Sequence, residues 1–183
     1  MSVGDNMETY IALLRGVNVG GKNTVPMKEL KALFEQAGFA DVSTFINSGN
    51  VLFTAEGSET ALAQQCEELI ARRFGFAVPV MVIASAVLKD AIAHAPDWWG
   101  HDADSTHNAL FVLPPATPET LMPQIGDTKP EYEQVASHGP VIFWSAPRKT
   151  WSRTRYSRIV GTKAYGSVTI RNANTARKLA GMV

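Results

Sequence analysis

Cysteine is almost absent from this chain of 183 residues, in which Cys66 is the only example. A single cysteine excludes an internal disulfide. No apolar run approaches the ~20 residues that span a bilayer. The first six residues lack the basic and apolar regions of a secretory signal, and Met7 is an alternative start. We therefore expect a cytoplasmic protein with no membrane partner, in which Cys66 is a buried small apolar residue.

Acidic residues are missing from the last part of the chain. Residues 134–183 contain nine lysines and arginines but no Asp or Glu, although the net charge of the whole chain is zero. Such asymmetry favours an anionic partner, either a small molecule or nucleic acid. The alternative is that this basic part packs against the acidic remainder of the same chain.

The first half of the chain follows the order strand, helix, strand, strand, helix, strand. Apolar runs predict strands at 9–14, 42–46, 51–54 and 79–83. Apolar stripes at helical spacing follow Pro26 and Ser58 and end before Gly38 and Gly75. This order is typical of the split βαβ, or ferredoxin-like, pattern.

A similar order begins again after a predicted helix at 85–94 and an irregular linker. Strands are predicted at 108–113, 132–136, 141–144 and 168–170, with helices at 117–122 and 175–180 and a helical or irregular stretch at 150–159. We therefore predict an α+β fold of two ferredoxin-like (split βαβ) halves in one compact chain, at 1–83 and 108–183, joined by residues 84–107. This duplication depends on element order alone, because the two halves do not resemble each other in sequence.

A glycine-rich loop at 15–25 follows the first strand, and its 11 residues exceed the usual connection of about 4–6. In the split βαβ pattern this loop and the turn at 47–50 lie at the same edge of the sheet. The next helix also begins there, and its free N–H groups favour an anion. We predict a phosphate or carboxylate site whose candidate residues are Arg15, Asn18, Gly20, Gly21, Lys22, Asn47, Ser48 and Asn50. The alternative is that the glycines and asparagines only satisfy tight turns.

The same loop imitates a phosphate-binding P-loop through Gly16, Gly21 and Lys22. Asn23, however, replaces the Ser or Thr that holds magnesium, and Pro26 moves the start of the helix past Lys22. The surrounding element order is also not that of a parallel nucleotidase sheet. We therefore do not expect a P-loop nucleotidase.

Two C-terminal segments extend the predicted site. We expect either Asn172 or Asn174 to cap the last helix, while Arg171 and the other asparagine reach the loop that carries Asn18 and Lys22. The alternative is a surface contact for Arg171 and a turn for both asparagines. A second segment could bind nucleic acid, because its basic residues alternate with Trp151, Tyr156 and Tyr165. These basic residues are Arg148, Lys149, Arg153, Arg155 and Arg158. The alternative is a solvated cationic helix that Trp151 and Ile159 anchor in the core.

No cofactor or metal is expected. His101, Asp102, Asp104 and His107 offer metal ligands, but their spacing matches no strong pattern and a solvated linker is favoured. No Ser/His/Asp arrangement can be assigned from the sequence.

The run from Tyr10 to Phe53, YIALLRGVNVGGKNTVPMKELKALFEQAGFADVSTFINSGNVLF, closely resembles the bacterial domain of unknown function 1697. Residues 168–179, VTIRNANTARKL, resemble the closing motif of that family, with Ala173 in place of its usual aromatic residue. The resemblance implies an α+β fold of ferredoxin-like pieces and brings no established activity. The family motifs fall on 15–26, 47–50 and 171–175.

Three functions remain open. The leading hypothesis is a binding module for a phosphorylated or other anionic ligand, with nucleic acid among the candidates. The second is an enzyme that acts on a small anionic metabolite at the same edge, although neither loop contains a histidine or carboxylate to act as a base. The third is a protein-interaction module in which Trp98, Trp99 and Trp144 form an apolar contact surface, and the favoured alternative places at least one of these tryptophans in the buried core. The sequence does not determine the oligomeric state.

Overall fold

A computed structural model describes residues 6–183. Internal contacts divide the chain into a first unit that extends to Leu88 and includes Val183, and a second unit, Lys89–Met182. The division lies within helix α3 (Ser85–Ala93), inside the segment 84–107 predicted to connect two halves. Within residues 6–183 no helix is long and apolar enough to cross a membrane.

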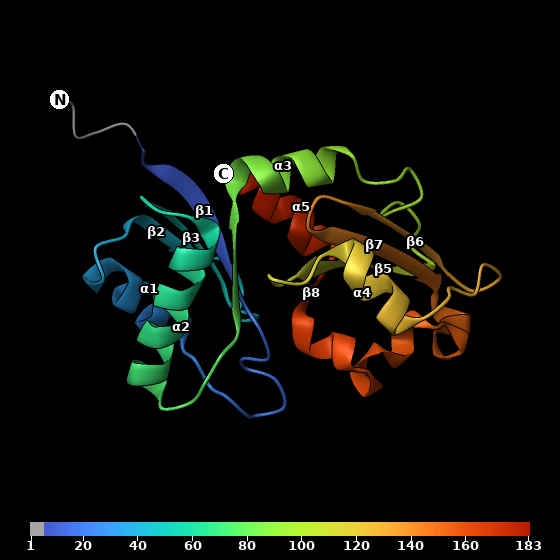
Figure 1. The fold of residues 1–183 in the computed structure, drawn as a ribbon, viewed down its shortest axis with the longest axis horizontal. Coiled ribbons are helices and arrows are strands. Elements are labelled where there is room, and N and C mark those ends of the chain that lie inside the picture. Colours follow the sequence, from blue (N-terminus) through green and yellow to red (C-terminus); the bar gives the residue numbers. More distant parts are fainter. Residues whose placement is uncertain (1–5) are drawn as a thin grey trace. The chain divides into compact units, whose positions relative to one another are not determined.

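The first unit contains one antiparallel sheet and two helices. Its elements are β1 (Glu8–Leu14), α1 (Met27–Gln36), β2 (Ala40–Thr44), β3 (Asn50–Ala55), α2 (Glu59–Phe74) and β4 (Val80–Ala84). The strand order is β2-β3-β1-β4, and each neighbouring pair is antiparallel (Figure 1). The predicted strands and helices are all present, and their ends differ from the predicted ends by a few residues.

Both helices of the first unit cover the same face of its sheet. Alternate residues of β1, namely Tyr10, Ala12 and Leu14, point to that face because side chains alternate along a strand. They share a buried cluster with the apolar sides of α1 and α2, which include Cys66. Burial raises the pKa of the Cys66 thiol to about 12, so the thiolate is scarce at neutral pH. The apolar role predicted for Cys66 is confirmed.

The second unit repeats the antiparallel arrangement. After α3 come β5 (Ser105–Val112), α4 (Pro118–Ile125), β6 (Gln134–His138), β7 (Val141–Pro147), β8 (Val168–Asn172) and α5 (Ala173–Met182). The strand order is β6-β7-β5-β8, with antiparallel neighbours. Three 3₁₀ helices at Arg148–Arg153, Tyr156–Gly161 and Lys163–Ser167 connect β7 to β8. The fold is therefore mixed α+β, with two four-stranded antiparallel sheets and, among the described residues, five α-helices.

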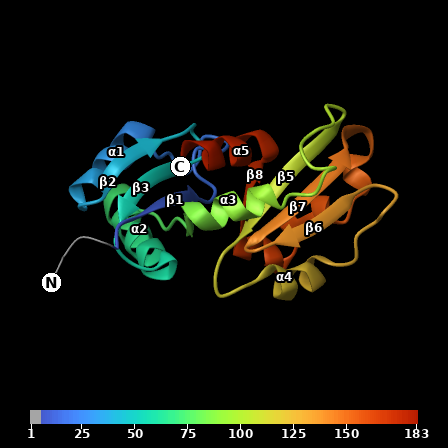
Figure 2. The ribbon, with the colours of Figure 1, turned by 90° about the horizontal axis from the view of Figure 1, so that it is seen from above.

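Both faces of the second sheet are covered, and Figure 2 shows α4 and α5 on opposite sides of it. On one face Trp144 packs with Tyr156 and Ile159 of the 3₁₀ segment. On the other face Trp99 meets the ring of Phe143 edge to face, with 4.9 Å between centroids. Trp99 and Trp144 are both buried, so the alternative that placed at least one of the three tryptophans in the core is confirmed, and an apolar contact surface formed by all three is wrong.

A buried carboxylate holds the 3₁₀ segment in place. Glu133 is only 4% exposed. Its Oε2 accepts from the backbone N–H of Arg155 at 2.5 Å and of Lys129 at 3.2 Å, and its Oε1 accepts from that of Tyr156 at 3.1 Å. Burial, and then the charge of Glu133, raise the pKa of Tyr156 to about 12. Glu133 is the last acidic residue in the sequence, and it binds backbone N–H groups of residues 155 and 156, within the part of the chain that has no acidic residue.

Candidate functional site

The glycine-rich loop and the β2–β3 turn meet at one edge of the first sheet, as the topology predicts. The side chain of Asn18 joins them, because its Nδ2 donates to the carbonyl oxygens of Asn47 at 2.8 Å and Val25 at 2.9 Å. Its Oδ1 accepts from the Val25 N–H at 2.8 Å. Both donor hydrogens of the amide are thereby used, so Asn18 holds the loop in shape.

The turn is held in a similar way by Asn50, which is fully buried. Its Nδ2 donates to the carbonyl of Phe45 at 2.8 Å and to Oγ of Ser48 at 2.9 Å. The carbonyl of Gly49 accepts from the N–H of Leu14, at the end of β1, at 2.8 Å. Asn50 therefore satisfies the backbone of the turn, which was the alternative interpretation of this residue.

The exposed part of this edge is the tip of the loop. Gly20 and Gly21 have positive φ angles of 59° and 71°, with open space where a Cβ would stand. Lys22 and Asn47 are exposed, and Arg15 is half-buried. The first turn of α1 has no side-chain cap at Pro26. The helix begins five residues after Lys22, and the sheet is antiparallel, so this is not a P-loop.

The start of α5 carries the C-terminal candidates. Oδ1 of Asn172 accepts from the N–H of Thr175 at 2.8 Å, so Asn172 caps the helix, which begins at Ala173 rather than Thr175. Asn174 lies exposed in the first turn. The capping prediction is confirmed, and the alternative that places both asparagines in a turn is wrong.

Arg171 is only 6% exposed. The alternative prediction, that Arg171 makes an ordinary contact at the surface, is therefore wrong. Nη1 of Arg171 donates to Oγ1 of Thr169 at 2.9 Å and to the carbonyl of Ile170 at 3.0 Å. Burial lowers its pKa to about 10. That Arg171 reaches the loop of the first unit stays a prediction.

A cleft of about 510 Å³ in the second unit gathers several candidates, and we call it the basic cleft. It is lined by Gly100, His101, Asp102, Ala103, Ser105, Thr106, His107, Arg148, Asn172, Ala173 and Asn174. Three predicted residues from segments far apart in sequence, Arg148, Asn172 and Asn174, thus line one cleft beside two histidines. The N-terminal end of α5 also opens into it.

The basic cleft has one carboxylate, that of Asp102, among its lining residues. Asp102 accepts from Oγ of Ser105 at 2.6 Å and from the N–H of Asp104 at 2.9 Å. These hydrogen bonds, the Ser105 bond first, lower the pKa of Asp102, so it is ionised at neutral pH. The anionic group of a ligand could pair with Arg148, and a hydroxyl group of the same ligand could donate to the carboxylate of Asp102.

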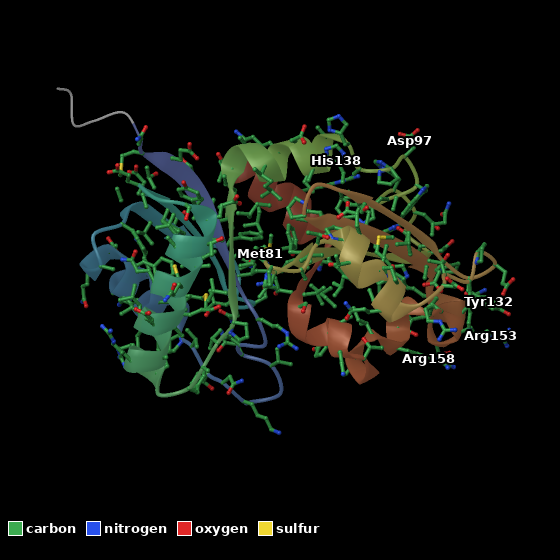
Figure 3. The ribbon with its side chains drawn as sticks, in the orientation of Figure 1. Met81, Asp97, Tyr132, His138, Arg153 and Arg158 are labelled. Atoms are coloured by element: carbon green, nitrogen blue, oxygen red, sulfur yellow. The ribbon has the colours of Figure 1, made fainter. Side chains whose placement is uncertain are left out.

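A second cleft of about 510 Å³ adjoins the first, and we call it the aromatic cleft. It shares His101, Asp102, Ser105 and His107 with the basic cleft and adds Trp98, Pro130, Glu131, Tyr132, Glu133, Gln134, Ser145, Ala146 and Pro147. The guanidinium of Arg153 lies 5.7 Å from the centre of the Tyr132 ring, and both are labelled in Figure 3. This cleft therefore offers aromatic side chains and carboxylates.

His107 lies in the wall between the clefts and makes two short contacts. Its Nε2 lies 2.7 Å from the carbonyl oxygen of Asp102, and its Nδ1 lies 2.5 Å from Oγ of Ser145. A carbonyl can only accept, so Nε2 carries a proton, and in the neutral imidazole Nδ1 then accepts from the Ser145 hydroxyl. Sequence reasoning missed this pair because the residues are 38 apart and face each other only through the register of β5 and β7.

The basic segment presents cations but directs two of its aromatic residues inward. Tyr156 is buried, and the ring of Trp151 lies 4.2 Å from that of Trp144. The predicted stacking of bases on Tyr156 is therefore wrong, and Ile159 anchors the core as the alternative proposed.

The cations of this segment are exposed at Arg148, Lys149, Arg153 and Arg158, whereas Arg155 is half-buried. Within residues 6–183 none of these five side chains lies within 4.0 Å of a carboxylate oxygen. The positive charge of the segment is therefore not neutralised by ion pairs of that kind.

Comparison with known proteins identifies relatives without an assigned activity. No curated protein matches the chain. A solved structure, described as that of conserved bacterial protein SP0830 from Streptococcus pneumoniae, is similar with a TM-score of 0.86 and 29% identity, over 96% of this chain and 98% of that one. The family model "Protein of unknown function (DUF1697)" matches residues 7–143. The chain therefore belongs to the DUF1697 family.

Proposed function

We propose that this protein is a binding module for a phosphorylated ligand, with the basic cleft as its principal site. The observation that carries the proposal is that Arg148, Asn172 and Asn174 line this cleft together with His101 and His107. Arg148 supplies a guanidinium that can hold two phosphate oxygens. The start of α5 favours a negative charge through its backbone dipoles.

The two adjoining clefts favour a ligand with two chemically different ends. The phosphate would lie near Arg148, away from Glu131 and Glu133 of the aromatic cleft. A ring would lie in the aromatic cleft, where Trp98 and Tyr132 offer apolar faces. Asp102 would accept a hydroxyl hydrogen between them. A nucleoside monophosphate has all three features, and a longer nucleic acid would extend along Lys149, Arg153 and Arg158.

We propose the loop edge of the first unit as a separate site for an anion, held by Arg15 and Lys22. We also propose that each unit has the ferredoxin-like topology. This interpretation is supported by the equivalent strand orders β2-β3-β1-β4 and β6-β7-β5-β8. In the second unit the 3₁₀ segment stands between the third and fourth strands, where the first unit has α2.

Titration calorimetry of the full chain with adenosine monophosphate, adenosine and inorganic phosphate tests the proposal. We expect binding of the nucleotide, and a loss of about tenfold in Arg148→Ala, because a hydrogen bond to a charged group contributes roughly 1.5–3 kcal/mol. The matched control is Arg158→Ala, which removes an exposed arginine that lines neither cleft.

The outcomes separate the versions of the proposal. Equal losses in both variants, with binding of a single-stranded oligonucleotide at low salt, would support an extended nucleic-acid surface. Binding of adenosine that matches binding of the nucleotide would remove the role of the phosphate. No binding of any of these molecules at low salt overturns the proposed function.

A second candidate, an enzyme that cleaves a small anionic ester, is favoured by the hydrogen bond between Ser145 and His107. Attack by Oγ of Ser145 on the ester carbon would pass its proton to Nδ1 of His107 and then to the leaving alkoxide, while Asp102 fixes the imidazole through its backbone carbonyl. Ser145 is only 5% exposed, which is why binding stands ahead of catalysis.

A fluorophosphonate probe tests this candidate by mass spectrometry. An active pair predicts one covalent label on Ser145, lost in Ser145→Ala and slowed about 100-fold in His107→Gln, because general bases contribute typically 10²–10⁴-fold. Absence of label on the folded wild-type chain, under conditions that label a known serine hydrolase, would reject the hypothesis that Ser145 and His107 cleave an ester.

A further inference from the structure

We infer that Asp90, His94 and His138 form a binding site for a transition-metal ion such as Zn²⁺ or Ni²⁺. Each residue offers one ligand atom, and these atoms all lie within 4.8 Å of one another. None of the three lines the basic or aromatic cleft, so this site is independent of the proposed function.

Two of the three side chains come from one face of a helix. Asp90 lies in α3, and His94 follows its last residue while still donating its N–H to the carbonyl of Asp90 at 3.2 Å. Residues four apart are neighbours on a helix surface. His138 ends β6 and comes from a different part of the second unit. Figure 3 labels His138 beside α3.

The side chains already contact one another without an ion. Nε2 of His138 lies 2.8 Å from Oδ2 of Asp90, and Nδ1 of His94 lies 3.3 Å from Oδ1 of the same carboxylate. The two imidazole rings are parallel within 2°, with 4.2 Å between their centres.

Binding of an ion requires rotation of exposed side chains and, where Nδ1 of His94 is the ligand atom, loss of its 2.8 Å contact with the backbone carbonyl oxygen of Asp90. A metal–nitrogen bond of about 2.0 Å lies in the plane of the imidazole ring, so the stacked rings must tilt toward a common point. The side chains of His94, Asp90 and His138 are 56%, 59% and 35% exposed, which leaves room for this tilt and for water as further ligands.

The ligand types select the class of ion. Two imidazoles and one carboxylate suit Zn²⁺, Ni²⁺ and related transition metals, whereas Mg²⁺ and Ca²⁺ prefer oxygen ligands. Among the described residues, the ligand atoms of His101, Asp102, Asp104 and His107, the metal ligands considered from the sequence, do not form a group within 4.8 Å of one another.

The experiment titrates the full chain, treated with EDTA and dialysed, with Co²⁺ and Zn²⁺. We expect one ion per chain, a visible Co²⁺ absorption band, and displacement of Co²⁺ by Zn²⁺. Affinity should fall at least tenfold in His138→Asn and in Asp90→Asn. Asp97→Asn is the matched control, because Asp97 is an exposed aspartate outside the cluster and should leave affinity unchanged.

Two results would overturn the inference. One is no binding of Co²⁺, Zn²⁺ or Ni²⁺ at micromolar concentrations. The other is binding that persists in His138→Asn and Asp90→Asn but disappears in His101→Asn, which would place the ion elsewhere. Asp90→Asn retains a similar shape on an exposed helix surface, so it keeps the test decisive if His138→Asn does not fold.

Discussion

Replacement of Glu133 by alanine is expected to lower the free energy of unfolding by about 3 kcal/mol, because hydrogen bonds to a charged group contribute roughly 1.5–3 kcal/mol each and are not additive. The carboxylate accepts from the backbone N–H groups of Lys129, Arg155 and Tyr156. Without it, these donors lose their acceptor in a region where water is largely excluded. The 3₁₀ segment between β7 and β8 should then loosen before the rest of the second unit.

Urea unfolding followed by fluorescence measures this loss, since Trp144 and Trp151 report on the second unit. Glu133→Gln should lose less, because its amide keeps one acceptor oxygen. Glu131→Ala is the matched control, as Glu131 is exposed and no hydrogen bond to its side chain is found among residues 6–183. A Glu133→Ala variant as stable as Glu131→Ala would show that the three contacts contribute nothing.

Much of the fold could be predicted because its signals are local. The helix α2 illustrates this: Ser58 accepts from the N–H of Ala61 at 3.1 Å, and Gly75 ends the helix with a φ angle of 82°. Both are consequences of residue type at a helix end. The start of α5 was placed too late because Ala173 and Asn174 give no strong helical pattern, although Asn172 was correctly among the two proposed caps.

The parts that sequence reasoning missed depend on contacts between distant segments. Glu133 binds backbone amides 22 and 23 residues away, and backbone groups carry no sequence signal. His138 lies 48 residues from Asp90. Pairs of this kind become visible only when the register of the strands and the position of the helix are known.

At the loop edge of the first unit, the sequence could not show which asparagines bind the backbone of the loop and the turn. Topology correctly brought the loop and the turn together, but it could not assign Asn18 and Asn50 to backbone contacts within them. An asparagine in a polar loop has the same sequence signature whether it binds a ligand or holds the loop. The hydrogen bonds of its amide group decide between the two.

Replacement of Gly49 by alanine should also be strongly destabilising, by about 3 kcal/mol. Gly49 has a φ angle of 88°, where an L-residue costs roughly 1–2 kcal/mol. A Cβ at this position would also stand 2.8 Å from Cβ of Leu14 and 2.8 Å from Cγ2 of Val17, and such overpacking costs roughly 1–3 kcal/mol. Neither neighbour can move easily, because both are buried in the core of the first unit.

Gly21→Ala separates the two causes, because Gly21 has a similar φ angle of 71° but no atom within 4 Å of the added carbon. It should lose only the backbone part, roughly 1–2 kcal/mol. Urea unfolding of both variants gives the comparison, and hydrogen exchange of the Leu14 amide, which donates to Gly49, reports on the turn itself. Equal losses in the two variants would mean that the turn moves aside to accept the methyl group. A larger loss in Gly49→Ala, with faster exchange at Leu14, would instead show that close packing against β1 fixes the position of the turn, and with it the loop edge that Asn18 joins to Asn47.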